Sequence, residues 1–125
     1  MSDAISLGEV VLDCPDPRTL GGFYAELLGG TVSPASTDEW VSLEGPASLL
    51  SFQRVSDFES PSWPDGVPQQ VHLDLSVDEF ARTHERVVAL GAVALDPVGP
   101  PVAGDARTFR VYADPAGHPF CLCMC

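Results

Sequence analysis

Four side chains that can carry chemistry stand at corresponding places in the two halves of this chain. Glu9 and Gln53 belong to the first half, and His72 and Cys121 belong to the second. Each is expected to point away from the apolar face of a predicted strand, because apolar and polar residues alternate there. A carboxylate, an amide, an imidazole and a thiol can move protons or bind a metal ion. The pattern therefore predicts a site built from corresponding strands of both halves.

Ordinary structural roles remain open for the same residues. His72 could be a hydrogen-bonded strand histidine paired with Asp74, and Cys121 could be a small packing residue. Glu9 could reach solvent at the end of its strand. Asp13 and Asp74 are expected on the same side as these residues, where they would be spare carboxylates for acid–base work.

The elements that must position these residues occur twice in the same order. Residues 5–30 predict a strand, a helix that begins after an aspartate, and a glycine stop, and residues 70–92 predict the same series. The matching positions share one offset in the sequence: Asp16, Leu28 and Gly29 recur as Asp78, Leu90 and Gly91. Tandem modules commonly form a functional site between them.

Short strand candidates complete each half. In the first half they lie at 31–35, 39–44 and 48–55, and in the second at 92–96, 107–113 and 118–124. The sequence therefore predicts an α+β fold in one domain, 1–125, made of two βαβββ modules at 5–55 and 70–125. The segment 56–69 is rich in proline and serine and is interpreted as a linker. If each helix covers one face of its sheet, the other faces would curl around a shared, cup-shaped cavity.

The same alternation predicts which side chains of the second module form its core. These are Val71, Leu73, Leu75 and Val77 on the first strand, Phe80, Val87 and Val88 on the helix, and Phe120, Leu122 and Met124 on the last strand.

Composition narrows the possible function. Hydrophobic residues make up 45% of the chain, enough for a core, and the formal charge of -12 opposes binding to nucleic acid or anionic membranes. No segment reads as a signal peptide or a membrane span, so a cytoplasmic protein is expected. Reduced thiols are the default for its four cysteines, and the alternating spacing of Cys121, Cys123 and Cys125 disfavours a bond among them.

Other polar and aromatic residues have both a structural and a functional interpretation. His84 and His118 are interpreted as surface residues. Three arginines could clamp an anion at the mouth of the cup or lie solvated at strand ends, and two tryptophans could stack on a flat ligand or pack locally. These residues are Arg54, Arg107, Arg110, Trp40 and Trp63.

Several of these motifs together resemble the vicinal oxygen chelate superfamily, which includes glyoxalase, extradiol dioxygenases and the bleomycin-resistance proteins. The resemblance covers residues 5–125 and is greatest to small glyoxalase-like domain proteins. It rests on Asp16 with Phe23-Tyr24 and Leu28-Gly29-Gly30, on His72-Leu73-Asp74-Leu75, and on Asp114-Pro115-Ala116-Gly117 before Phe120-Cys121.

The resemblance implies metal ligands at the first and last strands of each module. Those positions match Glu9, Gln53, His72 and Cys121, although the family pattern expects carboxylates where this chain has Gln53 and Cys121. Such a set would hold a divalent metal such as Zn, Fe, Ni or Mn, with Glu9 or Asp74 as the base.

Two functions follow from the resemblance. One is a metal-dependent lyase, isomerase or dioxygenase that acts on a small organic molecule through vicinal oxygens. The other is a non-catalytic protein of bleomycin-resistance type that sequesters a small molecule such as an antibiotic. The resemblance also implies a homodimer, in which the cup forms within one chain or across two.

Overall fold

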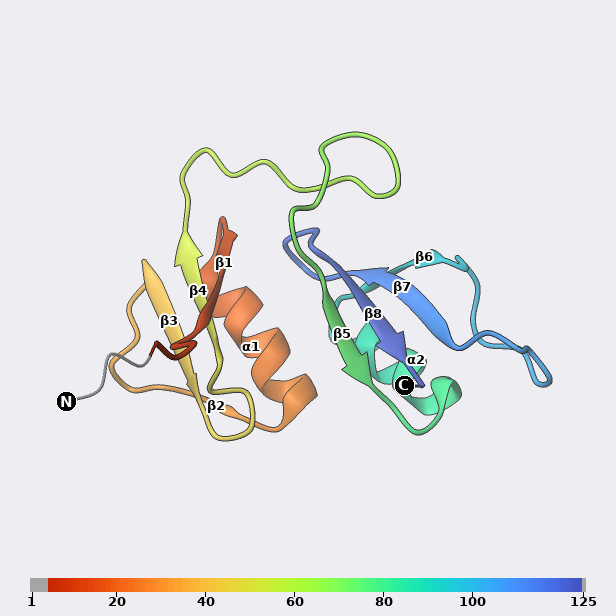
Figure 1. Ribbon diagram of the computed structural model, residues 1–125. Coiled ribbons are helices and arrows are strands. Elements are labelled where there is room, and N and C mark those ends of the chain that lie inside the picture. Colours follow the sequence, from red (N-terminus) through yellow and green to blue (C-terminus); the bar gives the residue numbers. More distant parts are fainter. Residues whose placement is uncertain (1–4, 125) are drawn as a thin grey trace. The chain divides into compact units, whose positions relative to one another are not determined.

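A computed structural model describes residues 5–124, and the chain divides between Phe58 and Glu59 into two compact units. The first unit contains β1 (Val10–Cys14), α1 (Pro17–Leu28), β2 (Thr31–Val32), β3 (Trp40–Glu44) and β4 (Leu50–Arg54). The second contains β5 (Leu73–Ser76), α2 (Phe80–Ala89), β6 (Val93–Asp96), β7 (Phe109–Ala113) and β8 (Pro119–Cys123). Both have the order βαβββ (Figure 1), which confirms the predicted α+β fold.

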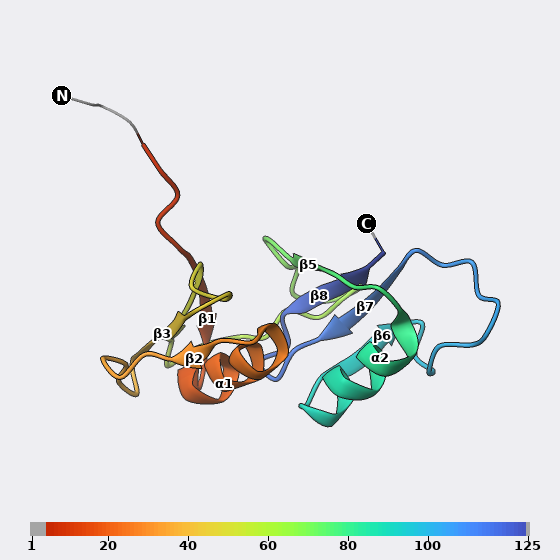
Figure 2. The same ribbon diagram turned by 90° about the horizontal axis from the view of Figure 1, so that it is seen from below.

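The two sheets have the same topology. The strand order is β1-β4-β3-β2 in the first unit and β5-β8-β7-β6 in the second. In each sheet the first strand pairs parallel with the last strand, and the other pairs are antiparallel. Each helix lies across one face of its own sheet (Figure 2), so the opposite face is open to carry a site.

The helix boundaries follow from local capping. Asp16 caps α1 by accepting backbone N–H groups from Arg18 and Thr19, and Gly29 ends the helix at a φ of 81°, which glycine adopts without strain. At α2 the predicted cap, Asp78, is wrong. Glu79 is the N-cap and its carboxylate accepts the N–H of Arg82 at 3.0 Å. Glutamate rarely caps a helix, so composition alone favours the aspartate.

An aromatic pair forms the centre of each core. Tyr24 of α1 stacks on Phe52 of β4 with ring centroids 5.8 Å apart, and the two rings are buried. In the second unit Tyr112 of β7 stacks on Phe120 of β8 at 5.6 Å, and both are fully buried. Leu122, also on β8, completes this apolar face. The prediction that Phe120 and Leu122 are core residues is confirmed.

Three predicted core residues of the second unit are exposed. Val71 is 67% exposed and Met124 is 50% exposed, because β5 begins only at Leu73 and β8 ends at Cys123. The alternation therefore extends beyond the paired strands. Val88 is 44% exposed, because the helix buries its neighbour Val87 instead.

None of the helices within residues 5–124 is long and apolar enough to cross a membrane.

Candidate functional site

The face of the second sheet opposite α2 carries the candidate site. Across this face Asp74 of β5 pairs with Cys121 of β8, which pairs with Val111 of β7. The next row contains Ser76, Cys123 and Phe109. Since side chains alternate between faces, these residues point away from the Tyr112 and Phe120 core.

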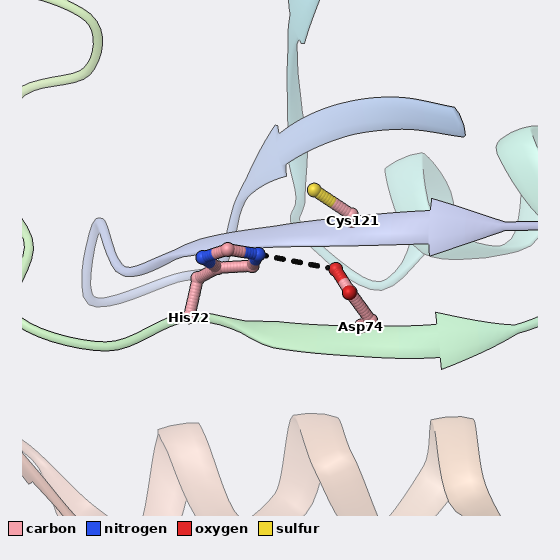
Figure 3. A group of neighbouring side chains, drawn as sticks. All are labelled: His72, Asp74 and Cys121. Atoms are coloured by element: carbon pink, nitrogen blue, oxygen red, sulfur yellow. Dashed lines mark ion pairs between the residues drawn. The ribbon is translucent and has the colours of Figure 1, made fainter. Parts of the chain in front are cut away.

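Three potential metal ligands meet on this face. The ligand atoms of His72, Asp74 and Cys121 all lie within 4.8 Å of one another. His72 Nε2 is 3.2 Å from Asp74 Oδ1, and Figure 3 shows the imidazole of His72 turned along the strand toward that carboxylate. His72 directly precedes β5 and Asp74 lies on it, whereas the neighbouring strand β8 supplies the third donor, Cys121.

The Cys121 thiol is held in its protonated form. Burial is the main cause, and the charge of Asp74 and the hydrogen bond that this carboxylate accepts from the thiol add to it; together they raise the pKa of Cys121 to about 11. A neutral thiol is a weak nucleophile and a poor metal ligand, because both roles need the thiolate. A metal that binds here must therefore displace this proton.

A pocket of about 360 Å³ lies over the three donors. Its volume is within the range of sites for small organic ligands, about 300 to 1,000 Å³. Besides the donors, its walls are mostly apolar. The remaining lining residues are Trp63, Gln69, Thr108, Phe109, Val111, Pro119 and Cys123.

The segment 59–71, here called the strap, supplies one wall of the pocket. Ser60 Oγ donates to the Ala116 carbonyl at 2.8 Å, which fastens the strap to the turn between β7 and β8. Ser62 N–H donates to Val67 O at 2.7 Å and closes a small loop within it. Trp63 and Gln69 are thereby placed at the pocket.

The residues predicted from the sequence fall into two groups. His72, Cys121 and the spare carboxylate Asp74 come together in the second unit. Glu9 and Gln53 belong to the first unit, where Glu9 directly precedes β1 and Gln53 pairs with Asp13. The separation from Glu9 to Asp13 along the strand is four residues, about 13 Å. Within their own unit Glu9 and Gln53 are therefore not neighbours.

The strand registers also revise which residues correspond between the units. The N-caps Asp16 and Glu79 are equivalent positions, and counting back from each to its first strand sets Val10 against Leu73. Val10 pairs with Leu50, and Leu73 pairs with Phe120. Counting from these pairs, Ser51 takes the place of Cys121, and Gln53 takes the place of Cys123. The sequence-based match of Gln53 to Cys121 is displaced by two residues, because alternation gives the face of a residue but not its register.

Within its described part, residues 5–58, the first unit does not repeat the donor cluster. Val11 pairs with Ser51 there, at the positions that Asp74 and Cys121 occupy in the second unit. Ser51 is 2% exposed and donates to Ser42 Oγ at 3.4 Å. The fold is duplicated, whereas the chemistry of this face belongs to the second unit.

Two residues interpreted as surface groups contact the same buried hydroxyl, that of Tyr112. Arg110 is 1% exposed; its Nε donates to the Tyr112 hydroxyl at 3.1 Å, and its Nη2 donates to the Gly99 carbonyl. His84 Nδ1 lies 2.8 Å from the same hydroxyl. The interpretation of Arg110 as a solvated residue is therefore wrong, whereas His84 is only partly buried; both lie on the helix side of the sheet, away from the pocket.

The other two arginines considered as anion clamps pair with carboxylates. Arg54 Nη1 lies 3.1 Å from Glu39 Oε1, and Arg107 Nη2 lies 3.3 Å from Asp96 Oδ1. The Arg107 guanidinium also lies over the Phe109 ring, 5.5 Å from its centroid, and so supports one wall of the pocket.

The cysteines are not all reduced. Cys14 and Cys121 are thiols outside any disulfide, whereas Cys123 is disulfide-bonded, so the expectation of reduced thiols is wrong at this residue. The regular strand spacing that disfavours such a bond ends with β8 at Cys123. Cys125 lies outside the described residues.

Comparisons with known proteins agree with the fold. The sequence model of the family described as 'Glyoxalase-like domain' matches residues 9–123 of this chain. No curated protein sequence matches the chain at a significant level.

Solved structures resemble almost the whole chain at low sequence identity. A possible glyoxalase from Bacillus cereus is 14% identical, with a TM-score of 0.67 over 96% of this chain and 99% of that chain. A glyoxalase/bleomycin resistance protein/dioxygenase family enzyme from Burkholderia phytofirmans is 14% identical, with a TM-score of 0.68 over 94% and 97%. The fosfomycin resistance protein FosX from Listeria monocytogenes is 18% identical, with a TM-score of 0.64 over 98% and 91%. At these identities the likeness shows the fold alone.

Proposed function

The chain belongs to the glyoxalase-like domain family of the vicinal oxygen chelate superfamily, and from this we propose that it binds a small organic molecule with the help of a divalent metal ion. We assign the metal to His72, Asp74 and Cys121, and the organic molecule to the pocket above them. The observation that carries this proposal is the convergence of the three donor atoms within 4.8 Å.

The geometry of the donors fits a metal ion after small movements. For bonds of ~2.0 to 2.3 Å at tetrahedral angles, two ligand atoms lie ~3.3 to 3.8 Å apart. The His72 and Asp74 atoms are already 3.2 Å apart, and Cys121 Sγ lies within 4.8 Å of both, so its side chain would have to rotate closer to bind the same ion. Nitrogen, oxygen and sulfur donors together suit Zn²⁺ or Fe²⁺. Glu9 and Gln53 remain predictions for further ligands.

The proposed activity is that of a lyase or isomerase. A bound metal ion supplies a Lewis acid that polarises substrate oxygens. The chain's own residues position the substrate and move protons. In this assignment one carboxylate oxygen of Asp74 binds the metal beside His72, and its second oxygen, on a side chain that is roughly half exposed, is the one available to accept a proton. The apolar walls exclude water from the substrate.

A second candidate function is metal-free sequestration of a small molecule. The observation that favours it is the partly buried position of the Cys121 thiol beside the Asp74 carboxylate, which raises the pKa of Cys121, since metal binding must first remove that proton. In this case the same pocket binds its ligand through apolar contacts, and His72 and Asp74 form only a hydrogen-bonded pair.

Metal analysis of the purified protein distinguishes the two functions. The chain is purified without added metal, and its metal content and melting temperature with Zn²⁺, Fe²⁺, Ni²⁺ and Mn²⁺ are measured. The metal-dependent function predicts one bound ion per chain and a raised melting temperature. His72→Ala should lose both effects, whereas the control His118→Ala should keep them.

Two results would count against the metal-dependent function. If no ion is retained and none raises the melting temperature, the metal-free function replaces it. If an ion remains bound to His72→Ala with unchanged affinity, the metal lies elsewhere.

A further inference from the structure

We infer that the pocket of the second unit is selective for a flat aromatic molecule that carries an N–H or O–H donor, and that Gln69 is the residue that recognises the donor. This inference rests on the proposed function, because it takes this pocket to be the ligand site. It adds a ligand class and a specificity-determining residue, and both come from the strap rather than from the metal-binding strands.

Gln69 has an unsatisfied acceptor. Its side-chain oxygen Oε1 is buried and has no hydrogen-bond partner within the part of the chain that the structure describes. Buried polar groups nearly always have a partner, because an unpaired acceptor loses its hydration without compensation. Gln69 is also a lining residue of the pocket. A buried acceptor without a hydrogen-bond partner is an exception of the kind that is expected at functional sites.

Two aromatic side chains line the same pocket. Trp63 comes from the strap, and Phe109 comes from β7. Phe109 is 46% exposed, which is high for a large apolar side chain in a cavity wall. Arg107 fixes this ring from outside the pocket lining, since its guanidinium lies 5.5 Å from the ring centroid and its Nε donates to the Phe109 carbonyl at 3.3 Å. The pocket therefore presents positioned aromatic surface for a planar ligand.

The size and chemistry of the site restrict the ligand further. A volume of about 360 Å³ admits a one- or two-ring molecule. The last torsion of a glutamine is broad, so rotation of the Gln69 amide can turn Oε1 toward a donor that enters the pocket. A ligand without a donor leaves this oxygen unsatisfied. A ligand with one supplies the missing hydrogen bond and binds more tightly.

The test compares indole with benzofuran, two fused rings of the same shape that differ in the presence of an N–H donor. Affinities are measured by NMR titration of the full chain, with the Trp63 indole N–H and the Gln69 side-chain amide as site-specific signals. Indole is expected to bind about tenfold more tightly than benzofuran. Gln69→Leu should abolish this preference. Gln70→Leu, at the exposed neighbouring position, is the matched control and should retain it.

A ligand-free readout accompanies the titration. Replacing the unsatisfied amide with leucine removes a buried polar group, so Gln69→Leu should melt about 3 to 6 °C higher than Gln70→Leu. The inference is overturned if benzofuran binds as well as indole, if neither binds, or if Gln69→Leu keeps the preference.

The metal is tested separately with His72→Ala. If His72→Ala loses the metal but still prefers indole to benzofuran, the result supports the pocket and the role of Gln69 independently of the metal. Absence of metal from the wild-type chain, together with a retained preference, rejects the metal-dependent function and leaves the selectivity of the pocket intact.

Discussion

The reactivity of Cys121 gives the sharpest test of the electrostatics of the site. At pH 8 a thiol with a pKa of about 11 is ionised in about one molecule in a thousand, whereas an ordinary thiol of pKa 9.0 is ionised in about one in ten. The thiolate fraction is thus about 100-fold lower. A more basic thiolate attacks faster, by about eightfold for two pKa units, so Cys121 should react about tenfold more slowly than an ordinary thiol.

Asp74→Asn is the informative perturbation. It removes the charge and the hydrogen bond of Asp74 but leaves burial, which is the largest cause of the raised pKa. The pKa of Cys121 should therefore fall to a value between 9 and 11, and the reaction at pH 8 should accelerate several-fold. The exposed Asp78→Asn is the matched control and should leave the rate unchanged.

The assay is the rate of reaction with a neutral aromatic disulfide between pH 7.5 and 11.5. Mass spectrometry of peptides assigns the modification to Cys121, and Cys14 is fully buried and should stay unmodified. A midpoint at or below pH 9 in the wild type would refute the account of the raised pKa. A midpoint unaffected by Asp74→Asn would refute the role assigned to the carboxylate.

Three further predictions follow from the structure. After correction for hydrolysis of the metal, Zn²⁺ affinity should rise about tenfold per pH unit between pH 7.5 and 8.5, because binding displaces the Cys121 proton. Calorimetry in two buffers measures the affinity and the released proton. An affinity that does not change with pH would exclude the Cys121 thiolate as a ligand. Gly22→Ala in α1 should stabilise the chain by ~0.5 to 1 kcal/mol, because nothing lies within 4 Å of the added carbon. Gly21→Ala should destabilise it by ~1 to 3 kcal/mol, because the added carbon would lie 2.7 Å from a β3 side chain. Urea unfolding measures both variants, and equal effects on stability would contradict this packing of α1. Burial, with a smaller effect of a nearby arginine, lowers the pKa of His84, so the unfolded state binds the proton more readily and the stability of the fold should decrease as the pH drops below ~6.5. NMR titration of His84 should give a midpoint below ~6.5, and His84→Asn should remove this part of the pH dependence of stability. A midpoint above ~6.5 would mean that protonation of His84 stabilises the fold instead.

Local patterns predicted most of the fold. The Asp16 cap and the Gly29 stop bound α1 where the sequence places it, because both signals depend on backbone groups within a few residues. The alternation around Phe120 and Leu122 gives the correct faces of β8. Strand ends were less predictable, since apolar residues such as Val71 continue past the last backbone pair.

The site was predictable only in part. His72, Asp74 and Cys121 are visible in the sequence because alternation sets their face, but the register that makes Asp74 the partner of Cys121 depends on pairing between distant strands. The role of Gln69 has no local signal. It lies in a segment that reads as a linker, and a hydrogen bond from Ser60 to the distant β7–β8 turn is among the contacts that place it.

The most direct test of the central claim is the absorption spectrum of the chain loaded with Co²⁺ in place of the proposed metal. Because Cys121 is one of the three proposed donors, the account predicts one Co²⁺ per chain with a sulfur-to-metal charge-transfer band in the near ultraviolet. Cys121→Ser should abolish this band, and His72→Ala should weaken binding. Stoichiometric Co²⁺ without the band, or a band that survives in Cys121→Ser, would contradict the assignment of the site.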